Sequence, residues 1–553
     1  MIRAPGRAAA NGDLAFIPLG GTGEIGMNLN LYRCDGAYIA IDCGIGFGTT
    51  PEVDVMMPDP TYIAERRKDL RALIITHAHE DHIGALAWLW PRLGCPVYGT
   101  AFALAVARRK LAERGLLNSV RLIEMIPGQR IDLAPFDIEP IHVAHSIVEA
   151  CALAIRTPHG TVLHTGDWKL DPTPLIGPPT DEAAFARLGE EGVLALVCDS
   201  TNALVEGHSG SEADVRRNLA TLIRDMPGRV AVTCFATNVA RMESIALAAK
   251  GAGRKVALVG RSLRNIAAAC AEVGYLQDLP PFLDDRAAGY LADDEVLLIC
   301  AGSQGEARSA LARIAADTHQ SIALGEGDTV IFSAREIPGN ERAIQRVQDD
   351  FARRGVDVMT ADDHMVHVSG HPARDELKRL YRLVKPRYAI PTHGEFRHLA
   401  EHADLAEDCG SEPILLEDGD VLRLGPGAPK VTDSAPVGRL VADGDRLLPI
   451  NGAALAARRT MLANGTVVAS LAVDASGKLL APPQLSAPGL FDSTAESDAL
   501  ARQLAEALGS LPAAVRRDDE GLREAARGAL RRAVNQSLAK RPTVEVHLLR
   551  LGG

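Results

Sequence analysis

The first 200 residues consist of short apolar runs separated by glycine-rich or polar turns. Residues 14–42 are predicted to form a strand, a glycine-rich turn and two further strands. A buried type of strand at 72–75 precedes a polar loop, and the apolar positions after that loop have helical spacing. The same pattern predicts strands at 97–98, 120–126, 137–143, 152–157, 161–165 and 193–198, and helices at 101–114 and 182–188. This part is therefore predicted to be rich in strands.

From Glu212 onward the pattern changes to a regular alternation of helix and strand. Apolar strands are predicted at 229–235, 255–260, 295–301 and 328–334, with helical segments between them. Such alternation predicts a doubly wound α/β domain with a parallel sheet. The earlier style returns near Val366. We therefore expect one domain in two parts, at 1–206 and 366–430, with the α/β domain at 207–365 inserted into it.

The C-terminal part is predicted to be a separate small domain. The stretch 425–445 is rich in Gly, Pro and Asp, so we expect a linker at 431–454. Residues 455–553 then predict an α+β domain. Its elements are a hairpin of 466–473 with 478–480, a helix near 516–541 with Arg523, Arg527 and Arg531 on one stripe, and a last strand at 543–551.

Composition narrows the class of protein. Of the 553 residues 47% are apolar and 24% charged, as in ordinary multidomain globular proteins. The net charge of −12 means that a polyanionic partner must be held by a local patch. Nine scattered cysteines without CxxC spacing favour a reducing compartment. Because the sequence also shows no apolar leader and no 18-residue apolar run, we expect a cytoplasmic protein without a membrane partner.

Three of the sixteen histidines fall within six residues, in the segment His77-Ala78-His79-Glu80-Asp81-His82. Alternate residues of an extended segment point the same way, so His77 and His79 can face one metal ion. Asp81 and His82, in the following turn, can face a second.

Four ligands cannot complete two sites, so further donors are needed at strand ends. His145, Asp167 and His393 each follow a predicted strand. A single histidine at a strand end is more often a hydrogen-bonded surface residue. The whole set instead favours two Zn²⁺ or Mn²⁺ ions about 3.5–4 Å apart, with Asp167 able to bridge them.

Two other features are better explained without binding roles. The segment LGGTGEIGMN spaces its glycines nearly like a dinucleotide-binding turn, but it leads into a strand-like run instead of a helix, so we reject that interpretation. His319 and His402 have no motif around them, and we expect both at the surface or in a helix.

Several motifs in order resemble a known family. HAHEDH, a later HS, TGDWKLD and PTHGE are similar to the metal motifs of the metallo-β-lactamase superfamily. VCDSTNA, FATNVARMESI, VGRSL, AGSQGEARSAL, GDTVIFSAREIPGNE and VHVSGH resemble the β-CASP nucleases and, among them, the bacterial ribonuclease J family, from about Phe16 to Leu399. The resemblance implies an α/β fold: a metallo-β-lactamase αββα sandwich, an inserted doubly wound α/β β-CASP domain and a small α+β C-terminal domain.

The resemblance also implies roles for particular residues. One ion would be held by His77, His79 and His145, the other by Asp81, His82 and His393, with Asp167 bridging. Asp42 would order the loop under the metals. Asp199 and His371 would act as proton donor and acceptor, and we count Asp81, Asp199 and His371 as catalytic. RNA and its phosphates would be bound by Thr237, Asn238, Ser303, Gln304, His367, Val368, Ser369, Gly370 and His371.

The implied activity is a two-metal ribonuclease acting on single-stranded RNA. It would degrade RNA from 5′ to 3′, prefer 5′-monophosphate ends, release 5′-mononucleotides and cut internally when RNA is threaded elsewhere, with a role in RNA maturation and decay. We rank Zn²⁺ ahead of Mn²⁺ as the cofactor, and we expect a homodimer or homotetramer formed through the C-terminal domain.

One departure and two alternatives stand beside this hypothesis. The family usually has Pro and Asp where this chain has Val148 and Glu149, so a hydrogen bond behind a metal ligand could be longer or missing. A small-molecule metallohydrolase is one alternative, which the long insert argues against. A non-catalytic RNA-binding or scaffold subunit of an RNA degradation complex is the other, which the intact ligand set argues against.

Overall fold

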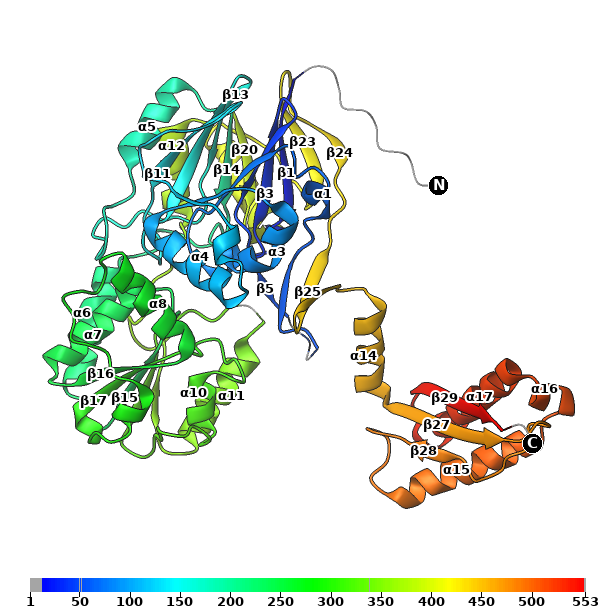
Figure 1. Cartoon of the computed structure of the whole chain (residues 1–553). Coiled ribbons are helices and arrows are strands. Elements are labelled where there is room, and N and C mark those ends of the chain that lie inside the picture. The colour runs from blue at the N-terminus through cyan, green and yellow to red at the C-terminus, as the bar shows by residue number, and fades with distance from the viewer. Residues whose placement is uncertain (1–11, 49, 51, 338, 552–553) are drawn as a thin grey trace. The chain divides into compact units, whose positions relative to one another are not determined.

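A computed structural model describes residues 12–48, 50, 52–337 and 339–551 (Figure 1). Residues 1–11, where we predicted no leader segment, lie outside the described residues. The chain forms two compact units. The first contains the described residues up to Phe47 and those from Val55 to Arg439, and the second contains the described residues of 48–54 and of 440–553.

The first unit contains a sandwich of two sheets. One sheet has the order β24-β23-β1-β3-β4-β7-β8-β9. Its strands are β1 (Leu14–Gly20), β3 (Leu29–Cys34), β4 (Ala37–Ile41), β7 (Leu70–Ile74), β8 (Val97–Gly99), β9 (Leu122–Glu124), β23 (Asp420–Gly425) and β24 (Lys430–Ser434). The other has the order β10-β11-β12-β13-β14-β20-β22. Its strands are β10 (Ile131–Leu133), β11 (Phe136–His142), β12 (Cys151–Thr157), β13 (Gly160–His164), β14 (Ala195–Asp199), β20 (Tyr388–Thr392) and β22 (Glu412–Pro413).

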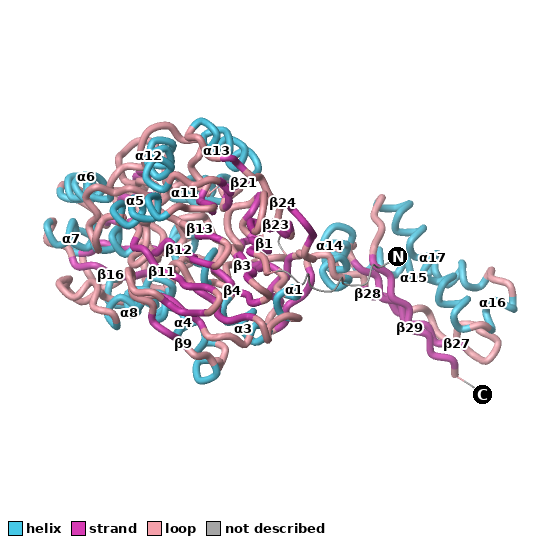
Figure 2. The backbone as a smooth tube through the Cα atoms, turned by 90° about the horizontal axis from the view of Figure 1, so that it is seen from above, coloured by secondary structure: helices cyan, strands magenta, loops and turns pink. Residues whose placement is uncertain are grey.

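Helices cover both outer faces of this sandwich, as Figure 2 shows. On one side lie α1 (Thr61–Ala64), α3 (Leu86–Leu93) and α4 (Ala101–Glu113), and on the other α5 (Glu182–Glu191), α12 (Arg374–Val384) and α13 (Phe396–Asp408). Inward-facing apolar side chains of both sheets, among them Phe16, Ile39, Leu153 and Val197, form one buried core. The predicted αββα sandwich is therefore confirmed.

Short elements complete the sandwich. They are β2 (Thr22–Gly23) paired with β21 (Gly394–Glu395), β5 (Gly46–Phe47) paired with β6 (Val55–Pro58), α2 (Glu80–Ile83) and the 3₁₀ turn Leu117–Ser119. The glycine-rich turn after β1 leads through β2 into the strand β3, so no helix follows it.

The insert is a doubly wound α/β domain, as predicted. Its parallel sheet has the order β16-β17-β15-β18-β19. The strands are β15 (Val230–Thr233), β16 (Lys255–Val259), β17 (Val296–Cys300), β18 (Thr329–Phe332) and β19 (Asp357–Met359). The helices are α6 (Glu212–Arg224), α7 (Val239–Gly251), α8 (Arg261–Glu272), α9 (Asp285–Ala288), α10 (Ala310–Ala315) and α11 (Glu341–Ala352), with a 3₁₀ turn at Asp293–Glu295. The pattern of apolar residues in the sequence did not predict α11 or β19.

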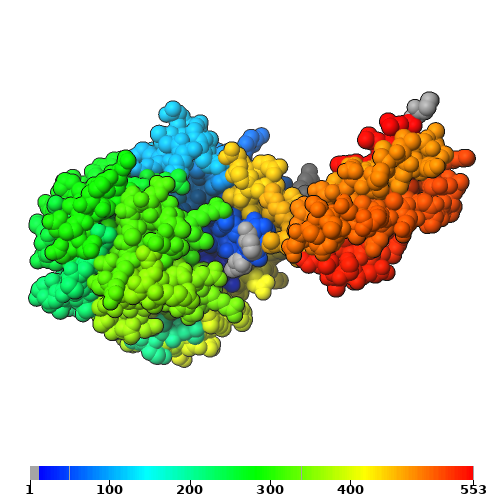
Figure 3. Space-filling model, turned by 90° about the horizontal axis from the view of Figure 1, so that it is seen from below, coloured from blue at the N-terminus to red at the C-terminus, as the bar shows by residue number. Residues whose placement is uncertain are grey.

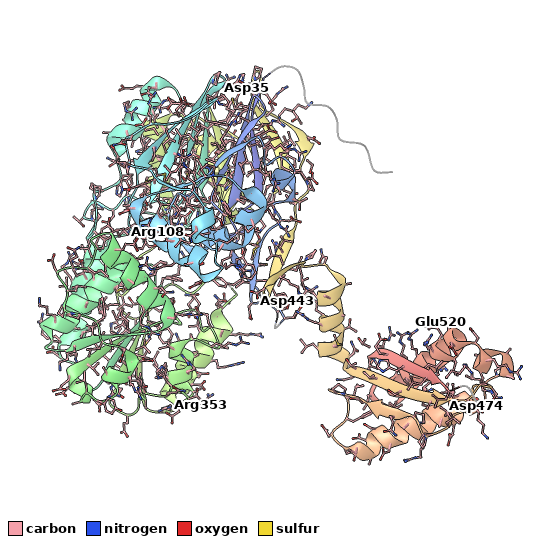
Figure 4. All side chains as sticks on the ribbon, in the orientation of Figure 1. Asp35, Arg108, Arg353, Asp443, Asp474 and Glu520 are labelled. Carbon is pink, nitrogen blue, oxygen red and sulfur yellow. The ribbon has the colours of Figure 1, made fainter. Side chains whose placement is uncertain are left out.

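The insert packs against the sandwich within the same unit (Figure 3). Arg108 and Arg109 of α4 form ion pairs with Glu272 at the end of α8 (Figure 4). Beside them, the Glu149 carboxylate accepts hydrogen bonds from the Phe102 backbone N–H (2.7 Å) and from the Tyr275 hydroxyl (3.0 Å). Glu149 thus joins the sandwich to the insert.

The second unit contains a three-stranded sheet and two long helices. Its elements are β25 (Arg439–Asp443), β26 (Arg446–Pro449), α14 (Ala453–Asn464), β27 (Thr466–Val473), β28 (Gln484–Ser486), α15 (Thr494–Gly509), α16 (Ala513–Arg517), α17 (Asp519–Leu538) and β29 (Thr543–Arg550). Strand β27 pairs with β28 on one side and, in parallel, with β29 on the other. Alternate residues of β27 pack on leucines of α15 and α17, including Leu504 and Leu530.

Two details of this region differ from the prediction. The predicted segment 478–480 contacts only the end of β27, through the bridge of Leu479 to Val473, and the longer antiparallel pairing of β27 is with β28. The expected linker 431–454 contains most of β24, together with β25 and β26. In the helix of the arginine stripe, Arg523 and Arg527 pair with neighbouring glutamates of α17. Within the described residues, no helix has the length and apolar character needed to cross a bilayer.

Candidate metal centre

The seven predicted metal ligands lie in one cluster, where strands of both sheets end. His77 follows β7, His145 follows β11, Asp167 follows β13 and His393 follows β20. His79 precedes α2, which contains Asp81 and His82. The carboxyl ends of parallel strands meet at one edge of a sheet, so residues distant in the chain converge here. Three groups of candidate ligands share Asp167: two are made of the predicted ligands, and the third joins Asp167 and His393 to Asp199 and His371.

The first group consists of His77, His79, His145 and Asp167. Nδ1 of His79 lies 3.1 Å from Nε2 of His77 and 3.0 Å from Nε2 of His145. Oδ2 of Asp167 lies 3.7 Å from Nε2 of His77 and also of His145. Tetrahedral Zn²⁺ with bonds of about 2.0–2.1 Å separates its ligands by roughly 3.3 Å, so these spacings suit such an ion.

The second group consists of Asp81, His82, Asp167 and His393. Oδ2 of Asp81 lies 3.2 Å from Nε2 of His393 and 3.6 Å from Nε2 of His82. Nε2 of His82 lies 3.2 Å from Oδ2 of Asp167. Of these four, Asp81 has the most exposed side chain, at 30%. This group therefore opens toward solvent on the Asp81 side.

Asp167 carries an observation that favours bound cations. Its Oδ1 atom is buried and has no hydrogen-bond donor within the described residues. Buried carboxylate oxygens without donors are rare because their desolvation is costly, and a metal ion would compensate that cost. The residues present therefore fit a pair of divalent ions.

The protonation of the cluster agrees with this fit. Burial lowers the pKa of His79 to about 4 and the pKa values of His77 and His145 well below the ordinary range, which leaves neutral imidazoles able to bind a metal. Burial also lowers the pKa of His393, but the adjacent carboxylates, Asp167 first, raise it to about 10. The negative charge of these carboxylates therefore favours a positive charge in the cluster.

Asp42 supports the cluster from behind. It has a φ of 63° at the end of β4, and its carboxylate accepts hydrogen bonds from the backbone N–H (2.8 Å) and hydroxyl (2.9 Å) of Thr76. Its Oδ2 atom also lies 2.7 Å from Nδ1 of His82. That contact fixes the ring of His82, so that Nε2 faces the second group.

His145 is held by the loop that contains the HVSGH motif. Its Nδ1 atom lies 2.6 Å from the carbonyl oxygen of Gly370. This hydrogen bond behind His145 involves neither Val148 nor Glu149. Val148 is buried, and Glu149 makes the contacts to Phe102 and Tyr275 described above.

Asp199 and His371 form a hydrogen-bonded pair beside the two groups. Oδ2 of Asp199 lies 2.8 Å from Nδ1 of His371, and its Oδ1 accepts hydrogen bonds from the N–H and hydroxyl of Thr201. His371 stacks on His393 with ring centroids 5.6 Å apart. Nε2 of His371 makes no hydrogen bond within the described residues, and its side chain is 22% exposed.

Two of the predicted RNA-binding residues have side chains that are engaged in contacts within the insert. Asn238 is buried, accepts a hydrogen bond from the Arg241 N–H and donates to Glu212, so it caps α7. Gln304 donates to the Arg335 carbonyl and accepts from the Ile337 N–H, so it joins two loops of the insert.

Ser369 and His367 belong to the loop whose Gly370 carbonyl contacts the metal ligand His145. Ser369 accepts a hydrogen bond from Asn202 (2.8 Å), and His367 has a buried Nδ1 atom without a partner among the described residues. Thr237 is partly exposed, whereas Ser303 and Val368 are buried.

Sequence reasoning missed several residues that hold the centre together. Asn202 donates to Ser369 and to the His371 carbonyl (3.0 Å), and it accepts from Arg335 (2.7 Å). Glu376 is fully buried and accepts from the backbone N–H groups of Leu170, Ser209 and Ala373. Asn202 lies within the VCDSTNA motif and Glu376 lies five positions after VHVSGH, but the sequence pattern assigns neither of them a structural role.

The expectation for two histidines was partly wrong. His402 does lie in a helix, α13, but it is fully buried between the Ser200 hydroxyl (2.8 Å) and the Tyr381 hydroxyl (3.0 Å). His319 lies in the loop after α10, and its side chain is only 4% exposed.

Comparison with known families agrees with this geometry. Residues 28–182 match the metallo-β-lactamase superfamily, 227–351 the β-CASP domain of ribonuclease J, 355–416 the Zn-dependent metallo-hydrolase RNA specificity domain, and 453–551 the C-terminal domain of ribonuclease J.

Curated relatives cover nearly the whole chain. Ribonuclease J of Sinorhizobium meliloti is 44% identical over 98% of this chain and 98% of its own. Ribonuclease J of Mycolicibacterium smegmatis is 38% identical, again over 98% of both chains. A crystal structure of a protein of unknown function from Enterococcus faecalis, 18% identical, has the same fold over 74% of this chain and 100% of its own, with a TM-score of 0.53. The chain therefore belongs to the ribonuclease J family of metal-dependent ribonucleases.

Proposed function

We propose that this enzyme hydrolyses the phosphodiester bonds of single-stranded RNA from the 5′ end, prefers a 5′ monophosphate and releases 5′-mononucleotides. Internal cleavage of threaded RNA and a role in RNA maturation and decay belong to the same proposal. The observation that supports it best is the convergence of seven His and Asp ligands with the Asp199–His371 pair in one cluster.

The ligand set supports two divalent ions. His77, His79, His145 and Asp167 would hold one ion, and Asp81, His82, Asp167 and His393 the other. Bound there, the ions would acidify a water molecule and neutralise phosphate charge. Imidazole donors predominate in the first group, which favours Zn²⁺, while the carboxylates also suit Mn²⁺.

His371 and Asp199 would move the proton that the leaving 3′ oxygen needs. Asp199 accepts at Nδ1 of His371, so it orients the ring and leaves Nε2 for the substrate or a water molecule. The carboxylate also stabilises the imidazolium form. Asp81, with the most exposed carboxylate of its group, would contact the attacking water.

The loop from His367 to His371 would read the 5′ end. It presents a hydroxyl, a glycine and two imidazoles, which together can bind a phosphate. Thr237 and Ser303 would contact the first nucleotides. Asn238 and Gln304 would act by shaping their loops, because their side chains are engaged within the insert.

The test is a degradation time course on three matched RNAs with 5′ monophosphate, triphosphate or hydroxyl ends. It includes Zn²⁺ or Mn²⁺, a chelator control, the variant Asp81→Ala and, as matched control, Arg346→Gln on the exposed face of α11. We expect mononucleotides released fastest from the monophosphate RNA, with loss in chelator and in Asp81→Ala only. Absence of metal-dependent cleavage would overturn the proposal in favour of small esters and lactams or of RNA binding without turnover.

We further propose assembly through the C-terminal domain. In β29, an edge strand of its sheet, Glu545, His547 and Leu549 form an exposed row. Removal of residues 455–553 should lower the mass measured by light scattering to that of one chain, and an unchanged number of subunits would contradict this. Cytoplasmic location stays a prediction from the cysteine pattern.

A further inference from the structure

A second group of metal-ligating side chains lies far from the catalytic cluster. Cys34 ends β3, Asp35 lies in the turn between β3 and β4, and His159 lies in the turn between β12 and β13. Their thiol, carboxylate and imidazole atoms all lie within 4.8 Å of one another.

This group lies at the opposite end of the sandwich from the catalytic cluster. Asp35 precedes β4 and Asp42 follows it, so a strand of five residues separates the two sites. At about 3.3 Å per residue, five residues span roughly 17 Å. Figure 4 shows Asp35 at the end of the sandwich away from the insert. The group is therefore no extension of the site already described.

The local backbone brings the three side chains together. Asp35 has a φ of 50°, and its N–H donates to the Asp13 carbonyl (3.1 Å). A Cβ added to Gly12 would lie 2.0 Å from Oδ1 of Asp35 and 3.4 Å from Nε2 of His159. The backbone of Gly12 therefore packs closely against these two side chains, and a larger residue at position 12 would displace them.

The donor set selects a class of ion. One sulfur, one nitrogen and one oxygen donor suit Zn²⁺ and similar transition metals, whereas Mg²⁺ and Ca²⁺ prefer oxygen alone. Nε2 of His159 lies 2.7 Å from Oδ1 of Asp35. The two atoms would part by roughly 0.6 Å to reach the spacing of tetrahedral Zn²⁺ ligands. Their side chains are 39% and 19% exposed for Asp35 and His159, so both can move.

We propose that Cys34, Asp35 and His159 form a second transition-metal site, with Zn²⁺ as the natural occupant and a water molecule as fourth ligand. Binding would release the thiol proton to solvent and form a bond from the thiolate to the metal. The ion would join a turn of one sheet to a turn of the other. Its role would be to stabilise the sandwich, because it lies too far from the scissile bond to take part in hydrolysis.

Cobalt(II) offers a test that separates this site from the catalytic one. The candidate ligands of the catalytic cluster are His and Asp only. A near-ultraviolet charge-transfer band from thiolate to Co²⁺ can therefore come only from a cysteine site. We expect the full-length protein, titrated with Co²⁺, to show this band in addition to the visible bands of the catalytic centre.

Two variants and a control complete the experiment. Cys34→Ser and His159→Gln should each abolish the charge-transfer band and the part of the Zn²⁺-induced rise in melting temperature that this site supplies, while RNA hydrolysis stays unchanged. His159→Gln also covers the case in which a serine hydroxyl at the buried position of Cys34 impairs folding. Cys409→Ser, at the one cysteine that is not buried, should keep the band.

Three outcomes decide the question. A band lost in both variants establishes the site. No band in the wild-type protein when the catalytic centre is saturated shows that Asp35 and His159 are an ion pair only. A band that survives His159→Gln places the thiolate elsewhere and also overturns the proposal.

Discussion

Nδ1 of His145 lies 2.6 Å from the carbonyl oxygen of Gly370, although the two residues are 225 positions apart in the chain. The first belongs to the sandwich motif after β11, and the second to the loop that would bind the 5′ phosphate. The metal ligand His145 and the loop 367–371 are therefore joined directly and form one unit. A shift of the loop must also move the ring of His145.

A methyl group at position 370 should disturb this unit. A Cβ there would lie 2.7 Å from Oγ of Ser146 and 2.8 Å from Cε1 of His145, closer than van der Waals contact allows. Contacts behind a metal ligand typically contribute 10- to 100-fold to activity or metal affinity. We expect Gly370→Ala to lower kcat for RNA by about 10- to 100-fold. Gly325→Ala, where the added Cβ meets nothing within 4 Å, is the matched control, and equal rates for both variants would refute the coupling.

Asp42 provides a second test of the support behind the ligands. The variant Asp42→Asn keeps the shape of the side chain but replaces the charged acceptor beside Nδ1 of His82 (2.7 Å). We expect metal to be retained about 10- to 100-fold less tightly, measured as metal content after dialysis against graded chelator. Asp69→Asn, at an exposed carboxylate before β7, should behave like the wild type. Equal retention by Asp42→Asn would show that Asp42 does not orient the ligand.

The ligand cluster was predictable because its motifs follow apolar runs. HAHEDH, TGDWKLD and PTHGE each begin where a buried strand ends, and parallel strand ends must meet. The contacts behind the ligands were not predictable. The Asn202 contact with Ser369 and the Glu376 contacts with Leu170 arise only when loops far apart in sequence pack together. A polar residue within or near a motif gives no sign of such a distant partner.

The errors of fold prediction have similar causes. All five residues of the edge strand β24 are exposed. Because neither face of this strand is buried, its sequence shows no alternation of apolar and polar residues and resembles that of a linker. In the C-terminal hairpin, Asp474 accepts from the N–H groups of Ser476 and Lys478, which forms the predicted turn. After the bridge of Leu479 to Val473 the chain moves away from β27, and it pairs with β27 again only at β28. The sequence pattern did not predict this second pairing.

Arg335 should bind an RNA phosphate. One guanidinium nitrogen donates to Asn202 (2.7 Å), which in turn donates to Ser369 and to the His371 carbonyl. Arg335 is itself exposed, so its other donors can reach a ligand beside the phosphate loop. For single strands each phosphate contact contributes about 0.7 to the slope of log affinity against log salt. We expect Arg335→Gln to reduce that slope by about this amount.

The measurement is equilibrium RNA binding at several salt concentrations, in chelator to prevent cleavage. Arg335→Lys should retain most of the slope, because it keeps the charge. Arg346→Gln, on the exposed face of α11, controls for loss of an arginine elsewhere. If Arg335→Gln weakens binding equally at all salt concentrations, the arginine acts through the position of its loop and not through a phosphate.

The carboxyl of Asp418 should make stability depend on pH. Burial and the neighbouring Glu24 raise its pKa from 3.8 to about 7, and the Glu24 pKa is raised as well. The folded protein therefore holds a proton that the unfolded chain releases above about pH 4, so folding stability falls as pH rises from about 4 to about 7. Asp418→Asn keeps the hydrogen bond from the Thr22 N–H (3.1 Å in the wild type) but removes the ionisation. We expect its melting temperature to match the wild type near pH 4 and to exceed it at pH 8. Asp433→Asn, on the exposed strand β24, is the control. A difference that stays constant with pH, or a less stable variant at pH 8, would show that the fold does not keep Asp418 protonated.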